Sequence, residues 1–247
     1  MEHTDYLSLI EGNAAAMVAT LENRPQAEIP SCPGWNGNDL LAHVANVLAQ
    51  KLPVFRQRLT SPPERSSWER SAPTDQGLGP RVVALAGEVV EQLAAMGPTA
   101  PLWSWYERDQ SSGFWARRLA HEAVIHRMDA ELAAGVRPSC SPEVGADGVG
   151  ELLAVFLARP GRPLSDQGAR AEIQLHGTDQ PCDWVVTLGG DDILVREGSS
   201  ADPAGRITGP AADLYLFGWG RRGPENLSID GDPALPGRLR ALAARAT

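Results

Sequence analysis

The stretch SSGFWARRLAHEAVIHRMDAELAA, residues 111–134, predicts one long helix. Ser111 or Ser112 can cap its start, because a side-chain oxygen there accepts a hydrogen bond from a free amide of the first turn. Four amphipathic helices within about 135 residues favour a four-helix bundle, since each must bury one face against the others. The other three segments with helical spacing are residues 5–21, the segment after Asn36 or Asn38, and residues 81–96.

The pattern of apolar residues changes beyond about residue 140. We therefore expect an α+β protein of two domains, a bundle over residues 1–137 and a small α+β domain over residues 142–247. A stretch rich in Pro, Ser and Gly at 135–149 separates them, and residues 59–79 are expected to form an exposed loop. Strands are predicted at 171–176, 183–188, 192–197 and 227–229, and helices at 148–158, after Gly209-Pro210 and after Asp232-Pro233.

The composition is that of an ordinary folded protein, with 43% hydrophobic and 21% charged residues in a chain of 247. A net charge of −9 argues against nucleic-acid binding, because a phosphate backbone attracts basic surfaces. No apolar run approaches a membrane span, and the first residues are acidic where a signal peptide carries basic charge. Three widely spaced cysteines favour reduced thiols. We expect a cytoplasmic protein that contacts neither nucleic acid nor membrane.

The segment 111–134 also carries candidate metal ligands. Glu122 and His126 are four residues apart, so their side chains stack on one face of the helix. His121 precedes His126 by five residues, about 140° around the helix, and does not share that face. A third ligand must come from another helix, and His43 lies within the apolar stripe of the second one. Two histidines and a carboxylate suit zinc with an open fourth position, although iron and nickel also accept them.

The same residues have a purely structural alternative. His43 can bond to a backbone carbonyl, and Glu122 can pair with Arg118, one turn earlier. Asp129, three residues after His126, can orient that imidazole in either case. Spacing alone leaves both interpretations open.

Several motifs occur in order along nearly the whole chain, and their combination resembles the mycothiol-dependent maleylpyruvate isomerase family. The resemblance implies a DinB-like four-helix bundle, followed by a C-terminal α+β domain similar to sterol-carrier-type domains. The motifs are Ile29-Pro-Ser-Cys-Pro-Gly-Trp35, Asp39-Leu-Leu-Ala-His43, His121-Glu-Ala-Val-Ile-His126-Arg-Met-Asp129-Ala-Glu131, and Gly209-Pro-Ala-Ala-Asp-Leu-Tyr-Leu-Phe-Gly-Trp-Gly-Arg221 followed by Ile229-Asp-Gly-Asp232.

The resemblance also implies a site. A divalent metal, usually zinc, is held by His43, Glu122 and His126, and water or the sulfur of mycothiol takes the fourth position. The functional arginine of the family corresponds to Arg221, and Arg222 beside it leaves the register open by one residue.

The implied function is that of a metal-dependent, mycothiol-using cis–trans isomerase acting on an electron-poor unsaturated small molecule. A zinc-bound thiol is deprotonated and nucleophilic, so it can add to such a double bond and allow rotation. The alternatives are a mycothiol S-transferase acting on an electrophilic metabolite, a thiol-independent metal hydrolase, and a binding protein without catalysis. We expect a monomer whose partners are mycothiol and a small-molecule substrate.

Overall fold

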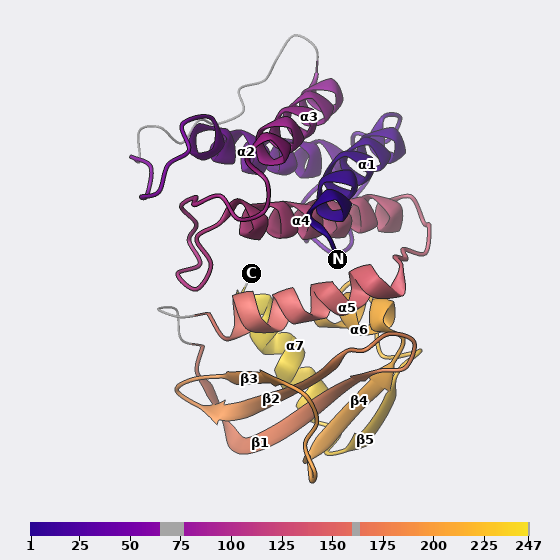
Figure 1. Cartoon of the computed structure of the whole chain (residues 1–247). Coiled ribbons are helices and arrows are strands. Elements are labelled where there is room, and N and C mark those ends of the chain that lie inside the picture. The colour runs from indigo at the N-terminus through magenta and orange to yellow at the C-terminus, as the bar shows by residue number, and fades with distance from the viewer. Residues whose placement is uncertain (65–76, 160–163, 247) are drawn as a thin grey trace. The chain divides into compact units, whose positions relative to one another are not determined.

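The computed structural model describes residues 1–64, 77–159 and 164–246, which fall into two compact units, Met1–Pro138 and Ser139–Thr247. In the described part of the chain, the first unit is built from long helices and the second from a five-stranded sheet with helices (Figure 1). The architecture is therefore α+β in two parts, as the sequence predicts.

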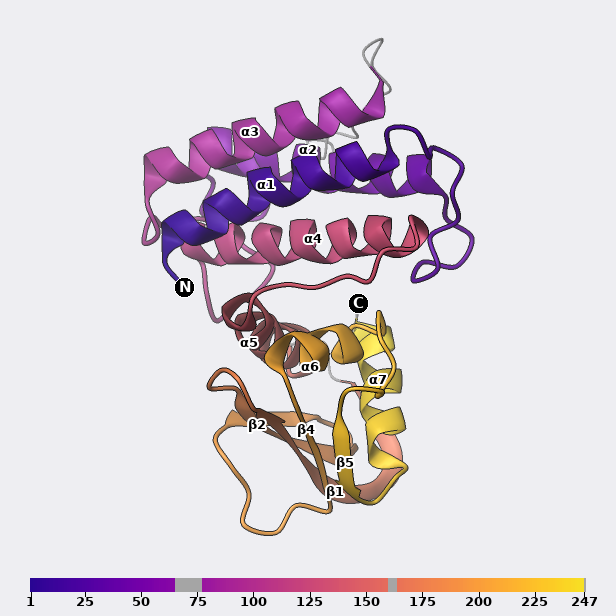
Figure 2. The same cartoon turned by 90° about the vertical axis from the view of Figure 1, so that its right-hand side faces the viewer.

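The first unit is a four-helix bundle (Figure 2). Helices α1 and α2 each pack against both α3 and α4, which places them at opposite corners of the bundle. The helices are α1 (His3–Leu21), α2 (Gly37–Arg56), α3 (Leu78–Met96) and α4 (Ser112–Ala133).

The structure decides which capping residues start the helices. Asn36 caps α2: its side chain accepts from the amide of Asp39, and the carboxylate of Asp39 accepts from the amide of Asn36 in return. Ser111 caps α4 by accepting from the amide of Phe114. Helix α3 begins at Leu78, three residues earlier than expected, and most of the predicted loop, residues 65–76, lies outside the described residues.

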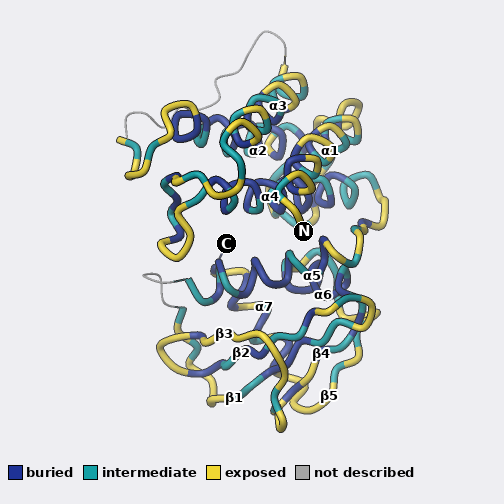
Figure 3. The backbone as a smooth tube through the Cα atoms, viewed as in Figure 1, coloured by how far each residue is buried: buried dark blue, intermediate teal, exposed yellow. Residues whose placement is uncertain are grey.

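Helix α4 is buried over most of its length, as the dark trace in Figure 3 shows. The buried residues include apolar ones such as Trp115 and Met128, but also His121, His126 and Asp129. Buried polar groups cost free energy unless they are hydrogen-bonded. The interior of this bundle must therefore supply partners for the polar side chains of α4.

The second unit carries a sheet in the order β3-β2-β1-β4-β5, in which β1 and β4 run parallel and all other neighbours antiparallel. Leu175 of β1 lies opposite Ile207 of β4, and both are fully buried. The elements are α5 (Pro142–Glu151), η2 (Leu152–Leu157), β1 (Asp166–Gly177), β2 (Asp183–Gly190), β3 (Leu194–Glu197), β4 (Gly205–Gly209), α6 (Ala211–Gly218), β5 (Ser228–Gly231) and α7 (Leu235–Ala246).

Two details of this unit correct the sequence prediction. The separating stretch is shorter than expected, because Ser141 caps α5 and the helix begins at Pro142 rather than near residue 148. Strand β4 was not predicted, because its five residues have glycine at both ends and only one large apolar residue, Ile207. Its place beside β1 is set by tertiary pairing rather than by local preference.

Two further observations concern the chain as a whole. Among the described residues, no helix is both long and apolar enough to cross a membrane. Among the same residues, no disulfide joins Cys32, Cys140 or Cys182.

The contact between α5 and α6 gives a test of the packing in the second unit. A Cβ atom added at Gly148 would lie 2.4 Å from Cε2 of the buried Tyr215 ring. We expect Gly148→Ala to lower the free energy of unfolding by about 1–3 kcal/mol, because a buried ring has no room to move away. Gly237→Ala in α7 is the matched control, since nothing lies within 4 Å of its added Cβ. It should leave stability unchanged or raise it by up to about 1 kcal/mol. Urea unfolding of both variants measures the difference, and equal effects would contradict this packing.

Candidate metal centre

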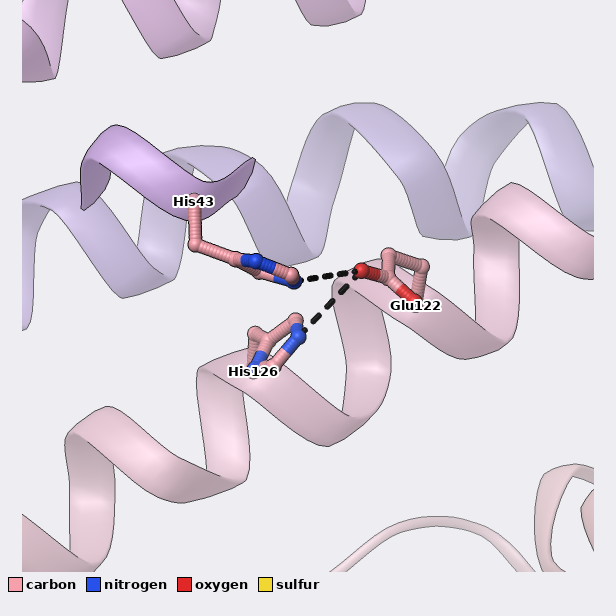
Figure 4. A group of neighbouring side chains, drawn as sticks. All are labelled: His43, Glu122 and His126. Carbon is pink, nitrogen blue, oxygen red and sulfur yellow. Dashed lines mark hydrogen bonds and ion pairs between the residues drawn. The ribbon is translucent and has the colours of Figure 1, made fainter. Parts of the chain in front are cut away.

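His43, Glu122 and His126 lie together in the bundle and point at a common position (Figure 4). His43 comes from α2, and the other two come from successive turns of α4. One oxygen of Glu122, Oε1, lies 3.2 Å from Nε2 of His43 and 3.2 Å from Nε2 of His126. One potential ligand atom from each residue lies within 4.8 Å of the others. The structure thus brings together the three residues that the sequence singled out.

A buried carboxylate orients one of the two imidazoles. Nδ1 of His126 donates to Oδ2 of Asp129 at 2.9 Å, which leaves Nε2 facing Glu122. Asp129 is fully buried, and its other oxygen accepts from the hydroxyl of Ser31 at 2.5 Å. The thiol of Cys32 lies 3.8 Å from Asp129 Oδ2. Such a partner fixes both the tautomer and the direction of the ring.

Glu122 is held from its other side by an arginine. Oε2 accepts from Nη2 of the buried Arg118 at 2.8 Å, while Oε1 faces the two histidines. The structural alternative is therefore partly correct: Arg118 does pair with Glu122, but the pair leaves one oxygen for the cluster. For His43, the structural alternative was a bond to a backbone carbonyl. Instead, Nε2 of His43 faces Oε1 of Glu122.

The loop before α2 packs against His43, the other histidine of the cluster. The ring of Trp35 lies 4.9 Å from that of His43, at an interplanar angle of 50°. The rings of His43 and His126 are also 4.9 Å apart and nearly perpendicular. The imidazole of His43 thus contacts two aromatic rings, although its side chain stays 36% exposed.

The charges of the cluster shift the protonation of its members. Burial acts to raise the pKa of Glu122, but the charge of His126, hydrogen bonds from both histidines and the nearby Arg118 outweigh it and hold the pKa well below its usual range. Burial acts to lower the pKa of His126, while Glu122 and Asp129 raise it to about 9. A cation that bound at Nε2 of His126 would take the place of a proton.

The donor set fits a divalent transition metal. Two imidazole nitrogens and one carboxylate oxygen are the ligands of open zinc sites, in which each bond is about 2.0–2.2 Å long. Donor atoms around such an ion lie roughly 3.2–3.6 Å apart. The distances of 3.2 Å from Oε1 of Glu122 to Nε2 of each histidine agree with that spacing. His121 is fully buried on the same helix and is not a member of the group.

The two candidate arginines lie in the second unit and have different surroundings. Arg222 forms a close ion pair with the buried Asp213, which also accepts from Asn226. Arg221 donates from Nη1 to the carbonyl of Trp219 at 2.8 Å, and its guanidinium lies 5.8 Å from the centre of the Trp219 ring. Both arginines are thus bound within their own unit, Arg222 through an ion pair with a buried carboxylate and Arg221 through a backbone carbonyl and an aromatic ring.

Sequence reasoning missed two residues near the cluster. Ser31 was quoted only as part of a motif, and its bond to Asp129 spans 98 positions of the chain. Lys51 lies on α2 with its ammonium 5.4 Å from the centre of the Trp115 ring. Burial lowers the pKa of Lys51 to about 8, although the charge of Glu122 acts to raise it. The sequence offers one reason to notice Lys51: it is the only lysine in the chain.

The fold and the cluster define the class of protein: a DinB-like four-helix bundle with a His–Glu–His donor set, joined to a separate α+β unit. Two family models match the chain. The mycothiol maleylpyruvate isomerase N-terminal domain matches residues 7–131, and the MDMPI C-terminal domain matches residues 143–238. The chain belongs to the mycothiol-dependent maleylpyruvate isomerase family.

Solved structures agree on the fold. Two crystal structures of mycothiol-dependent maleylpyruvate isomerase, one of them of a mutant with a histidine replaced by alanine, are similar to this chain with TM-scores of 0.60 and 0.61. In both comparisons 93% of each chain is covered, at 13% sequence identity. Among curated proteins, none matches this chain significantly.

The different surroundings of the two arginines give a prediction about stability. Arg222→Met leaves the buried carboxylate of Asp213 without its ion-pair partner. We expect this variant to lower the free energy of unfolding by about 3 kcal/mol, because an uncompensated buried charge is costly. Arg221→Met should change it by less than about 1 kcal/mol. Chemical denaturation of both variants makes the comparison, and a larger loss for Arg221→Met would reverse the assignment.

Proposed function

We propose that this chain is a metal-dependent cis–trans isomerase that uses mycothiol and acts on an electron-poor unsaturated small molecule. The observation that carries the proposal is the group of His43, Glu122 and His126, found in a chain of this family. A binding protein without catalysis would have no need of a donor set that leaves a coordination position open. We further propose that the enzyme works as a cytoplasmic monomer.

The metal is proposed to be zinc, bound by Nε2 of His43, Nε2 of His126 and Oε1 of Glu122. These three residues would hold the ion, and the chemistry it would supply there is a lowered thiol pKa, so that a thiol beside it would be a nucleophile at neutral pH. A free thiol with a pKa near 8.5 is mostly protonated under the same conditions.

The reaction uses this nucleophile reversibly. When bound, mycothiol would supply a sulfur nucleophile that adds reversibly to one carbon of the cis double bond. The two carbons would then be joined by a single bond that can rotate, and loss of the thiol would give the trans isomer with the thiol unchanged.

The residues of this chain orient the participants. Asp129 holds the ring of His126, Arg118 holds the outer oxygen of Glu122, and Trp35 packs against His43. These contacts keep three donor atoms converged before any ligand arrives, which reduces the reorganisation required during the reaction. We assign to Arg221 the stabilisation of negative charge on the substrate or on the enolate.

Metal content tests the ligand assignment directly. We expect about one zinc per chain in the purified protein, and less than a tenth of that in His43→Ala and His126→Ala, because each loses one of three protein ligands. His176→Ala is the control, since that imidazole belongs to the second unit, is partly exposed and bonds to Asp183. Elemental analysis after dialysis against limiting zinc gives the stoichiometry. Full zinc occupancy in His126→Ala would refute the ligand set.

Product analysis tests the reaction. With limiting thiol, an isomer of unchanged mass should form over many turnovers, because the thiol is released at the end of each cycle. Arg221→Ala should keep its zinc and lose about a hundredfold in rate, since the charge it stabilises develops only during the reaction. Mass spectrometry separates the alternatives. A thiol adduct formed once per thiol would identify a transferase, and addition of water without thiol would identify a hydrolase.

A further inference from the structure

Ser31, in the loop between α1 and α2, carries a hydroxyl to which the proposed function gives no role. Its Oγ donates to Oδ1 of Asp129 on α4 at 2.5 Å, across 98 positions of the chain. This distance lies at the short end of O–H···O hydrogen bonds and is typical of a hydroxyl that donates to an ionised carboxylate. The bond is therefore a specific contact between this loop and the helix that carries two of the metal-ligand candidates.

Asp129 links this hydroxyl to the metal centre. Its carboxylate is fully buried, with Oδ1 accepting from Ser31 and Oδ2 accepting from Nδ1 of His126 at 2.9 Å. The last torsion of an aspartate side chain has a broad range, so a contact at one oxygen does not fix the plane of the carboxylate. Donors at both oxygens define that plane, and the direction of the His126 ring follows from it.

The loop that carries Ser31 is held in shape by its own backbone. The amide of Ile29 donates to the carbonyl of Trp35 at 2.9 Å. The amide of Cys32 donates to the carbonyl of Ile29, and the amide of Trp35 to the carbonyl of Cys32, both at 3.0 Å. A loop closed by three such bonds responds as a unit, so a change in the contact of Ser31 with α4 also affects the position of Trp35.

Through Trp35 the same loop reaches the other histidine. The rings of Trp35 and His43 lie 4.9 Å apart, and Asn36, the next residue, caps the helix that carries His43. The rings of His43 and His126 are themselves 4.9 Å apart. The bond from Ser31 thus ties to α4 a loop that packs on the α2 ligand.

We propose that Ser31 is a positioning residue of the metal centre, whose hydroxyl fixes the carboxylate of Asp129 and, through it, the direction in which Nε2 of His126 meets the ion. The proposal rests on the proposed function, because it assigns Ser31 to the centre formed by His43, Glu122 and His126. In this role Ser31 touches neither the metal nor the substrate. Its hydroxyl should therefore be detectable in the affinity for zinc, measured without any substrate.

Competition with a chelator of known affinity measures zinc binding to the full chain. Loss of an outer partner of a ligating histidine typically costs about 10–100-fold in metal affinity. We expect Ser31→Ala to weaken zinc binding by about five- to tenfold, less than a direct partner would, because Ser31 lies one hydrogen bond further from the ion. Ser31→Thr keeps the hydroxyl and should bind zinc within about twofold of the unchanged chain.

A control variant separates the hydroxyl of Ser31 from a general disturbance of the bundle. Thr20→Val removes another half-buried hydroxyl of the same unit, one that donates to the carbonyl of Ala16 within α1 at 2.8 Å. It should change zinc affinity by less than about twofold. Equal losses in Ser31→Ala and Ser31→Thr would place the effect in the packing of the loop rather than in the hydroxyl, and would overturn the proposal.

A double-mutant cycle tests whether Ser31 acts through Asp129. Asp129→Asn keeps the shape of the side chain but not its charge, and should weaken zinc binding by about 10–100-fold. Adding Ser31→Ala to this variant should change the affinity by less than about twofold, because the carboxylate through which Ser31 acts is gone. A further loss as large as that in the unchanged chain would contradict the proposed route. If Asp129→Asn does not fold, the comparison of Ser31→Ala with Ser31→Thr decides.

The outcomes distinguish this proposal from the proposed function. Equal zinc affinity of the unchanged chain and Ser31→Ala would reject the role of Ser31 and leave the metal centre and the isomerase standing. Zinc affinity that depends on the hydroxyl, in a chain without thiol-dependent isomerisation, would support the role of Ser31 and reject the isomerase. A chain that binds no zinc would reject both.

Discussion

The contact of one carboxylate with two imidazoles inside a helical bundle is the constraint on which the rest of the first unit depends. Glu122 lies 3.2 Å from a nitrogen of each histidine, and only 17% of its side chain is exposed. Taking a carboxylate out of water is expensive unless charged and hydrogen-bonding partners surround it. Arg118 supplies one of these partners from the same helix, and His43 must be supplied by α2. The packing of α2 on α4 is therefore fixed by chemistry as well as by apolar contact.

The loop between α1 and α2 follows from the same constraint. Its backbone is closed by a hydrogen bond from the amide of Ile29 to the carbonyl of Trp35. Within this closed loop, Ser31 bonds to Asp129, which in turn holds His126, while Trp35 packs on His43. One short segment thus contacts the surroundings of both histidines. The Pro- and Gly-rich motif that marks this loop in the sequence therefore shapes a wall of the site.

Most of the helical framework could be predicted from the sequence, because helices depend on local spacing. The three side chains of the cluster, His43, Glu122 and His126, were also singled out from their positions on such helices. A capping residue and an apolar stripe define α2, and a separation of four residues puts Glu122 and His126 on one face. The choice of His43 rested on its place in an apolar stripe, where a polar side chain needs a partner. The family resemblance then pointed to the same three residues.

The remaining features could not be predicted, because they depend on contacts between distant segments. The bond between Ser31 and Asp129 joins residues 98 positions apart, and strand β4 exists through its pairing with β1. The relation of Lys51 to Glu122 appears only when α2 and α4 are packed together. The different surroundings of Arg221 and Arg222 could not be predicted either, because they depend on the ion pair between Arg222 and Asp213. Periodicity describes the faces of single elements, and none of these facts belongs to a single element.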